Sequence, residues 1–298
     1  MSAALAAVSL VILAGCSGSP QSNLTPSNGS LAQAWPGANS SLVDSAGGPK
    51  NIYIASYYND TLYTFKTDGT PTTPTITAGL NGPVGVATDV AGKIYVANSG
   101  SSTVTTYRPN GRQTTPTITS GVENPRGIVV DANGKIYVAN YDNGTVTTYN
   151  SDGTPTTPTI TGLSLPEDLA VDANGKIYVA NSGTGTLTTY DSNGNPQAPT
   201  ISGLQYPVGV AVDANGKIYI CQLSANSMLT FRANGNPTTP TISVSNPVVV
   251  AVGPTGKIYV SSTAGDGGNG TLTTYNKRGL EIAPTMTGFD DPDGIALH

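Results

Sequence analysis

The stretch DANGKIYVAN, Asp172 to Asn181, reads as a tight turn followed by a β-strand, and it decides the fold. Its Ile-Tyr pair recurs with tyrosines at positions 53, 95, 137, 178, 219 and 259, at spacings of 42, 42, 41, 41 and 40 residues. A fixed period of about 20–50 residues indicates a repeat architecture, in which each unit needs its neighbours to bury one of its faces.

One full unit runs from Asp168 to Gly203 and contains four short strands separated by turn residues. We name them strand A (168–172), strand B (176–181), strand C (186–190) and strand D (197–203). The Asn-Gly and Asp-Gly pairs between them favour hairpin turns because both residues tolerate positive φ. Strand D carries a proline in every repeat, which suits an outer edge because proline has no N–H to donate to a ladder. This pattern predicts a β-propeller blade.

The number of strands predicts the number of blades. Each of the four strand types occurs six times, but the chain begins with a strand B at 52–55 and ends with a strand A at 294–297. The two ends must therefore complete one blade together. We predict an all-β fold over residues 50–298, a six-bladed propeller of four-stranded antiparallel blades, closed by pairing the C-terminal strand A with the N-terminal strands B to D.

The repeat also resembles a known family. Pro-Val-Gly-Val-Ala-Val-Asp at 207–213, and Asn-Gly-Lys-Ile-Tyr-Val-Ala-Asn-Ser-Gly at 174–183, look like the NHL repeat and the related repeats named for Tyr-Val-Thr-Asn. The resemblance covers about residues 50 to 298. It implies the propeller fold, but it leaves function open because such propellers serve as scaffolds, sensor domains, lyases and lactonases.

Composition narrows the class of protein. Of 298 residues only 10% are charged and 36 are Gly, which is typical of a turn-rich β protein. The formal net charge of -5 excludes nucleic acid as a general partner. We expect a monomer with a single large β domain.

The N-terminal sequence predicts the cellular localisation of the protein. Residues 3–14 form an apolar run that is too short to span a membrane and has the length of a signal peptide. The run ends in Leu13-Ala14-Gly15-Cys16, which resembles the lipobox of bacterial lipoproteins and implies lipidation of Cys16. We therefore predict a signal peptide at 1–15, then a lipidated cysteine and a disordered linker at 16–49. By the same resemblance, Gly18 favours the outer membrane or cell surface of a bacterial envelope.

The predicted topology separates charge between two faces. We call the side with the D-to-A and B-to-C connections the top face, and the side with the A-to-B and C-to-D turns the bottom face. The bottom face carries a formal +4, and because the linker joins the propeller on this face at residue 50, the face should look toward an anionic membrane. The Asp172/Lys176 type of pair should stabilise its turns. The top face carries one base, Arg126, and nine acids: Asp60, Glu123, Asp142, Glu167, Asp168, Asp266, Asp290, Asp291 and Asp293.

The position after each strand-A proline should ring the mouth of the central channel. Around the ring it reads Val84, Arg126, Glu167, Val208, Val248 and Asp293. Glu167, Asp168 and Arg126 could form an ion pair, or the acids could bind a cation or a cationic ligand. For Glu167, Asp168 and Asp293, ligation through oxygen alone would suit Ca²⁺.

Catalytic signatures are scarce. The only His is His298, the last residue of the sequence, so a Ser-His-Asp arrangement and the His-dependent propeller lyases are poor matches. We predict a binding platform whose acidic top face contacts an envelope protein, a glycan or a cationic ligand. One alternative is a Ca²⁺-dependent hydrolase or lactonase acting at the channel mouth, and another is a purely structural spacer.

Overall fold

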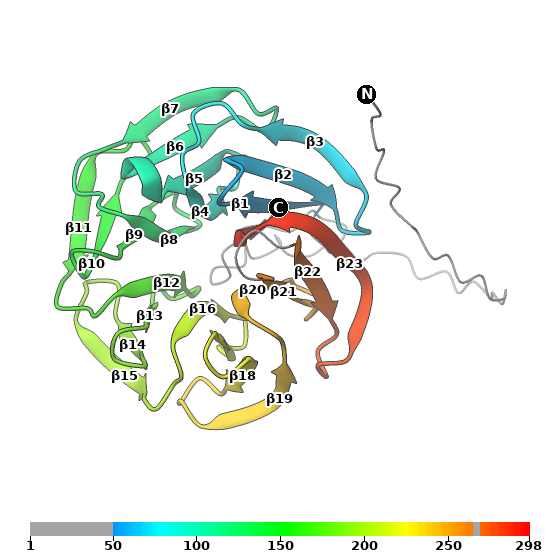
Figure 1. Cartoon of the computed structure of the whole chain (residues 1–298). Coiled ribbons are helices and arrows are strands. Elements are labelled where there is room, and N and C mark those ends of the chain that lie inside the picture. The colour runs from blue at the N-terminus through cyan, green and yellow to red at the C-terminus, as the bar shows by residue number, and fades with distance from the viewer. Residues whose placement is uncertain (1–49, 265–268) are drawn as a thin grey trace, which may run out of the picture. The chain divides into compact units, whose positions relative to one another are not determined.

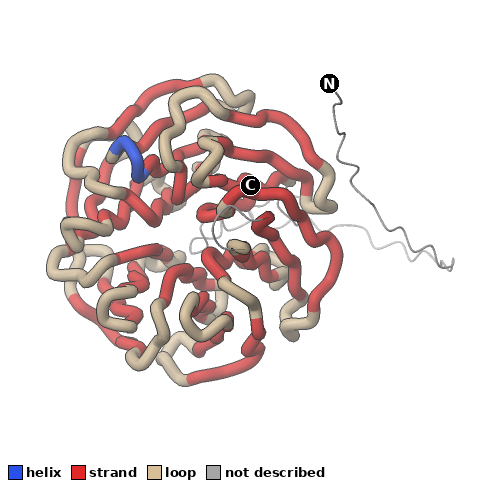
Figure 2. Tube along the Cα trace, in the orientation of Figure 1, coloured by secondary structure: helices blue, strands red, loops and turns tan. Residues whose placement is uncertain are grey.

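The computed structural model describes residues 50–264 and 269–298, which belong to one compact unit of the chain. They form six four-stranded antiparallel sheets arranged around a centre, with one strand of each sheet innermost (Figure 1). Strand dominates the trace and the single described helix is the short 3-10 turn η1 (Ser99–Ser101) (Figure 2). The predicted six-bladed propeller is confirmed. The predicted signal peptide, Cys16 and the linker lie outside the described residues.

The elements follow the predicted order from the inside of each blade to the outside. The inner strands are β4 (Pro83–Thr88), β8 (Pro125–Val130), β12 (Pro166–Val171), β16 (Pro207–Val212), β20 (Pro247–Val252) and β24 (Pro292–Leu297). The second strands are β1 (Asn51–Ser56), β5 (Ile94–Asn98), β9 (Ile136–Asn140), β13 (Ile177–Asn181), β17 (Ile218–Gln222) and β21 (Ile258–Ser262). The third strands are β2 (Thr61–Lys66), β6 (Thr103–Tyr107), β10 (Thr145–Tyr149), β14 (Thr186–Tyr190), β18 (Ser227–Phe231) and β22 (Asn269–Tyr275). The outer strands are β3 (Pro71–Ile76), β7 (Gln113–Ile118), β11 (Pro155–Ile160), β15 (Pro196–Ile201), β19 (Pro237–Ser243) and β23 (Glu281–Asp290).

The ring closes where the two ends of the propeller meet. The sheet order β24-β1-β2-β3 places the last strand of the chain beside the first. Ile54 pairs with Ile295, and Ile52 pairs with Leu297. The backbone of His298 extends this pairing, donating to the carbonyl of Asn51 at 2.9 Å. The predicted closure by a C-terminal strand A is therefore confirmed.

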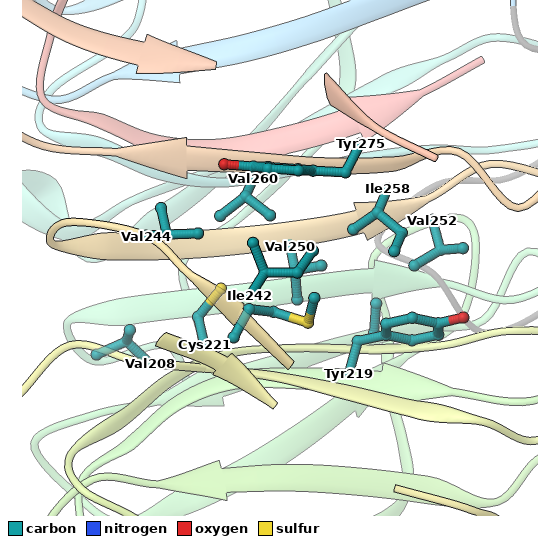
Figure 3. Close-up of a cluster of buried hydrophobic side chains, with 12 residues drawn as sticks. Val208, Tyr219, Cys221, Ile242, Val244, Val250, Val252, Ile258, Val260 and Tyr275 are labelled. Carbon is teal, nitrogen blue, oxygen red and sulfur yellow. The ribbon is translucent and has the colours of Figure 1, made fainter. Parts of the chain in front are cut away.

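The core is divided among the interfaces between blades. Six clusters of buried apolar side chains each join two neighbouring blades. In the cluster of Figure 3, Tyr219 and Cys221 of β17 pack toward Val250 and Ile258 of the next blade. Cys221 is a free, fully buried thiol whose pKa is raised by burial. It acts as a small apolar residue.

The bottom turns differ in detail from the prediction. Asp172 accepts the backbone N–H groups of Asn174 and Lys176 at 2.8 and 3.0 Å, and its second oxygen accepts the Tyr178 hydroxyl at 3.2 Å. The Lys176 ammonium instead donates to the carbonyl of Ala198 and lies 5.5 Å from the centre of the Tyr178 ring. The aspartate thus shapes the turn, while the lysine ties strand B to the outer strand of the same blade.

Candidate functional site

A local irregularity aims one residue of every blade at the channel mouth. The pairing between the inner and second strands shifts register just after the inner-strand proline in each blade. Such bulges re-aim a side chain at the end of a strand. The six predicted residues, which we call the mouth ring, all line one cavity of about 230 Å³: Val84, Arg126, Glu167, Val208, Val248 and Asp293. The structure thus brings together the four predicted binding residues, since Asp168 also borders this cavity.

Arg126 and Glu167 form an ion pair in neighbouring blades. Arg126 Nη1 lies 3.8 Å from Glu167 Oε2, and the guanidinium carbon lies 4.7 Å from the centre of the Tyr141 ring. The Arg126 side chain is 31% exposed and that of Glu167 only 10%. The separation of 3.8 Å between Nη1 and Oε2 is too long for a hydrogen bond, so the two side chains attract each other through charge alone. Arg126 Nε is buried and has no hydrogen-bond partner among the described residues. The Nε–H group of Arg126 therefore remains without an acceptor in this ion pair.

Glu167 sits at the centre of a small polar cluster. Ser182 Oγ donates to its Oε1 at 3.3 Å. Burial raises the pKa of Glu167, while the Arg126 charge and hydrogen bonds with Ser182 and Tyr206 act in the opposite direction. Burial and a hydrogen bond with Tyr206 raise the pKa of Tyr141 to about 12. Sequence reasoning missed Tyr206 and Tyr141, although an aromatic residue at position 206 stands out against Asn124 and Asn246 in equivalent loops.

Asp293 lies in a different part of the ring. It is half-buried and lines the cavity at the mouth. Burial raises its pKa well above the ordinary range, and the nearby Asp291 charge adds to this; Arg126 opposes it, and Glu167 raises it further. A proton is thus held at the mouth to higher pH than on an ordinary aspartate.

The effect of Asp293 on stability depends on pH. Because its pKa is raised on folding, the folded state holds a proton that the unfolded state has released, and stability falls as pH rises above about 4. Asp293→Asn removes this cost. We expect the melting temperature of the variant to exceed that of the wild type, by a margin that grows from pH 4 toward neutral. A margin that stays constant across that range, measured by circular dichroism, would contradict the assignment.

The structure assigns Asp168 a different role from the one predicted. Its side chain is 4% exposed. Oδ1 accepts the Leu169 N–H at 2.9 Å, and Oδ2 accepts the Val210 N–H of the next blade at 3.0 Å. The carboxylate therefore joins two blades. Among residues 50–264 and 269–298, no group of three or more His, Cys, Asp or Glu side chains could hold a metal ion. Glu167, Asp168 and Asp293 therefore do not fit the predicted shared Ca²⁺ site.

His298 lies at the opposite end of its strand from the mouth ring, beside the A-to-B turn of the next blade. A Cβ added at Gly92 in that turn would meet His298 Nε2 at 2.9 Å. Burial lowers the pKa of His298; the Asp89 charge opposes this, and Lys50 adds to it. Since its strand, β24, ends on the bottom face, the imidazole is not a candidate for chemistry at the mouth. The described part of the chain contains no helix long and apolar enough to cross a membrane.

Comparison with known proteins agrees with this architecture. The NHL repeat family model matches residues 123–149, which include β8, β9 and β10. The structure is similar to that of a protein of unknown function from Bacteroides caccae, with 14% sequence identity and a TM-score of 0.69 over 84% of this chain and 98% of that chain. No curated protein matches the sequence.

Two lyase structures share the fold at similarly low sequence identity. A streptogramin B lyase structure has 12% identity and a TM-score of 0.62, covering 88% of this chain and 86% of that chain. Virginiamycin B lyase from Staphylococcus aureus has 12% identity and a TM-score of 0.61, covering 84% and 83%. Identities this low show a common fold and nothing of the activity. The chain is a six-bladed β-propeller built from NHL-like repeats.

Proposed function

We propose that this propeller is a binding platform whose mouth ring takes up a cationic side chain of a protein partner. The observation that carries the proposal is the arrangement of charge in the cavity, where Glu167 and Asp293 border the same space as the apolar Val84, Val208 and Val248. An apolar wall with a few converging charged groups is typical of ligand sites. A lysine or arginine side chain matches both parts, because it has an apolar stem and a charged end.

The size of the cavity supports a side chain rather than a whole ligand. Its volume of about 230 Å³ lies below the range of about 300–1,000 Å³ usual for pockets that enclose small molecules. The loops of the top face contain no Lys or Arg, and the one base of the mouth ring, Arg126, is paired with Glu167, so the excess of acids around the mouth attracts cations. An incoming ammonium group would also favour the ionised form of Asp293.

The cellular setting is part of the same proposal. We propose that lipidated Cys16 anchors the chain in a bacterial envelope and that the basic bottom face looks toward the membrane. The mouth ring would then face outward, where it meets an envelope protein. Labelling with a fatty-acid analogue tests the anchor, because the label should be present on the wild type and absent from Cys16→Ser.

The binding site is tested with a matched pair of small probes. Nα-acetyl-lysine amide carries the charge, and Nα-acetyl-norleucine amide has a similar apolar stem without it. We expect the lysine probe alone to raise the melting temperature of the full chain, since binding to the native state stabilises it. Glu167→Gln with Asp293→Asn should weaken binding about 10- to 100-fold, because hydrogen bonds to charged groups contribute about 1.5–3 kcal/mol.

The control variant is Glu123→Gln. Glu123 is an acid of the same face but belongs to a loop, and Asn143 donates to it at 3.3 Å. This variant removes one negative charge from the top face without changing the mouth ring, so lysine binding should persist. Equal stabilisation by the lysine and norleucine probes would refute the proposal, as would equal losses in Glu123→Gln and in the double variant.

A further inference from the structure

The loop before each inner strand repeats one backbone feature. The residue just before the inner-strand proline has positive φ in all six blades: Gly82 (55°), Asn124 (43°), Leu165 (50°), Tyr206 (55°), Asn246 (44°) and Asp291 (58°). In each blade its carbonyl oxygen accepts the N–H of the first residue after the second strand, for example Ser182 to Leu165 at 3.1 Å and Leu223 to Tyr206 at 3.0 Å. The left-handed conformation turns this carbonyl toward the neighbouring loop and ties the two top loops together.

Two of the six residues do not suit that conformation. Glycine adopts positive φ freely, and Asn and Asp tolerate it, whereas other side chains are strained there. Leu165 and Tyr206 are the exceptions, and they occupy neighbouring blades. Each is also a large apolar side chain that is 37% exposed. Neither folding nor solubility explains this choice, because the same loop in four other blades uses Gly, Asn or Asp.

Tyr206 lines the mouth cavity. Leu165 is linked to Glu167 through Ser182, whose Oγ donates to the Leu165 carbonyl at 3.0 Å and to Glu167 Oε1 at 3.3 Å. The Tyr206 hydroxyl also acts to lower the pKa of Glu167, against the effect of burial. Leu165 comes two residues before Glu167, and its side chain covers Gly183 so closely that an added Cβ would lie 3.2 Å from Leu165 Cγ. The side of the mouth nearest Glu167 therefore carries a pair of exposed apolar groups, which we call the ledge. Backbone strain retained at such a place is typical of binding sites.

We propose that the ledge docks an apolar side chain that neighbours the basic residue in a partner peptide. This inference rests on the proposed function, and it adds the partner's sequence type: a Lys or Arg adjacent to a Leu, Ile or aromatic residue. The occupant is a basic segment because Asp291 lines the cavity together with Glu167 and Asp293, and the loops of the top face carry the further acids Asp60, Glu123 and Asp142 but no base. The ledge supplies contact area, while the mouth supplies charge complementarity.

The test replaces Leu165 and Tyr206 by asparagine, the residue that two other blades have at the equivalent position. Leu165→Asn and Tyr206→Asn should melt at or above the wild-type temperature, because Asn relieves the strain. The same variants should lose the preference for acetyl-Lys-Leu amide over acetyl-Lys-Ser amide, which we expect to be about tenfold in the wild type. A gain in stability together with a loss of peptide preference separates a binding role from a purely structural one. Tyr206→Phe, which keeps the ring, should retain the preference.

The control introduces the same backbone strain, a leucine at a position of positive φ, into a blade that has no ledge residue. Asn246→Leu should lower the melting temperature and leave the peptide preference unchanged. If acetyl-Lys-Leu amide and acetyl-Lys-Ser amide bind the wild type with equal affinity, and both bind more tightly than acetyl-Ser-Leu amide, the mouth-ring proposal is correct and the ledge proposal is wrong. If neither lysine peptide exceeds acetyl-Ser-Leu amide, the proposed function itself is wrong. Retention of the preference in the Leu165→Asn, Tyr206→Asn double variant also overturns the ledge.

Discussion

Removal of residues 292–298 is expected to abolish the folded propeller. This segment supplies β24, the inner strand of the blade that joins the two ends of the chain. Its loss would leave β1 with an unpaired edge and would expose apolar side chains on both sides of that blade. Ile295 and Leu297 are 1% and 2% exposed. We expect the truncated chain to lose its cooperative thermal transition, monitored by circular dichroism, and to aggregate through the open edge.

A single substitution measures the same closure in graded form. Ile295→Ala deletes buried methyl and methylene groups opposite Ile54, and it should lower the free energy of unfolding by about 2–5 kcal/mol. Leu280→Ala is the matched control because Leu280 is 60% exposed in an outer turn. Denaturant titration gives both values. A truncated chain that unfolds at the wild-type midpoint would show that the remaining strands close the ring without β24.

The propeller could be predicted from sequence because its determinants are local and repeated. The Ile-Tyr period marks one strand per blade, and the outer prolines mark the edge of each sheet. The missing strand A before Ile52 and the extra one after Pro292 predict the closure. The mouth ring was also within reach, since one position after a repeated proline must occupy equivalent places around the channel.

The environment of each mouth residue could not be predicted in the same way. Asp168 follows Glu167 directly, and both were assigned to the mouth from their positions after the strand-A proline Pro166. In the structure both residues border the cavity, but the carboxylate of Asp168 accepts the N–H groups of Leu169 and of Val210 in the next blade, whereas Glu167 makes no such backbone contact between blades within the described part of the chain. That contact depends on how two blades pack, which no local pattern records. Tyr206 was missed because it reaches the cavity that Glu167 lines from a neighbouring blade.

Asp168 should behave as a structural residue when it is replaced. Asp168→Ala would remove the acceptor for Val210 N–H, and Val210 is fully buried at 0% exposure. An unsatisfied buried donor costs about 1–3 kcal/mol, and the Leu169 N–H loses its side-chain acceptor as well. We expect the free energy of unfolding to fall by about 2–4 kcal/mol in denaturant titration. Asp168→Asn keeps one oxygen acceptor and should fall between the wild type and Asp168→Ala.

Glu167→Ala is the control, because it removes the adjacent carboxylate without breaking a contact between blades through the backbone. Its partner Arg126 is 31% exposed, so water replaces much of the lost interaction, and the expected change is within about 1 kcal/mol. Binding of the lysine probe should show the opposite ranking, with a larger loss in Glu167→Ala than in Asp168→Asn. If Asp168→Ala kept wild-type stability and lost only lysine binding, Asp168 would be a ligand-contacting residue, and the structural role assigned to its contact with Val210 would be wrong.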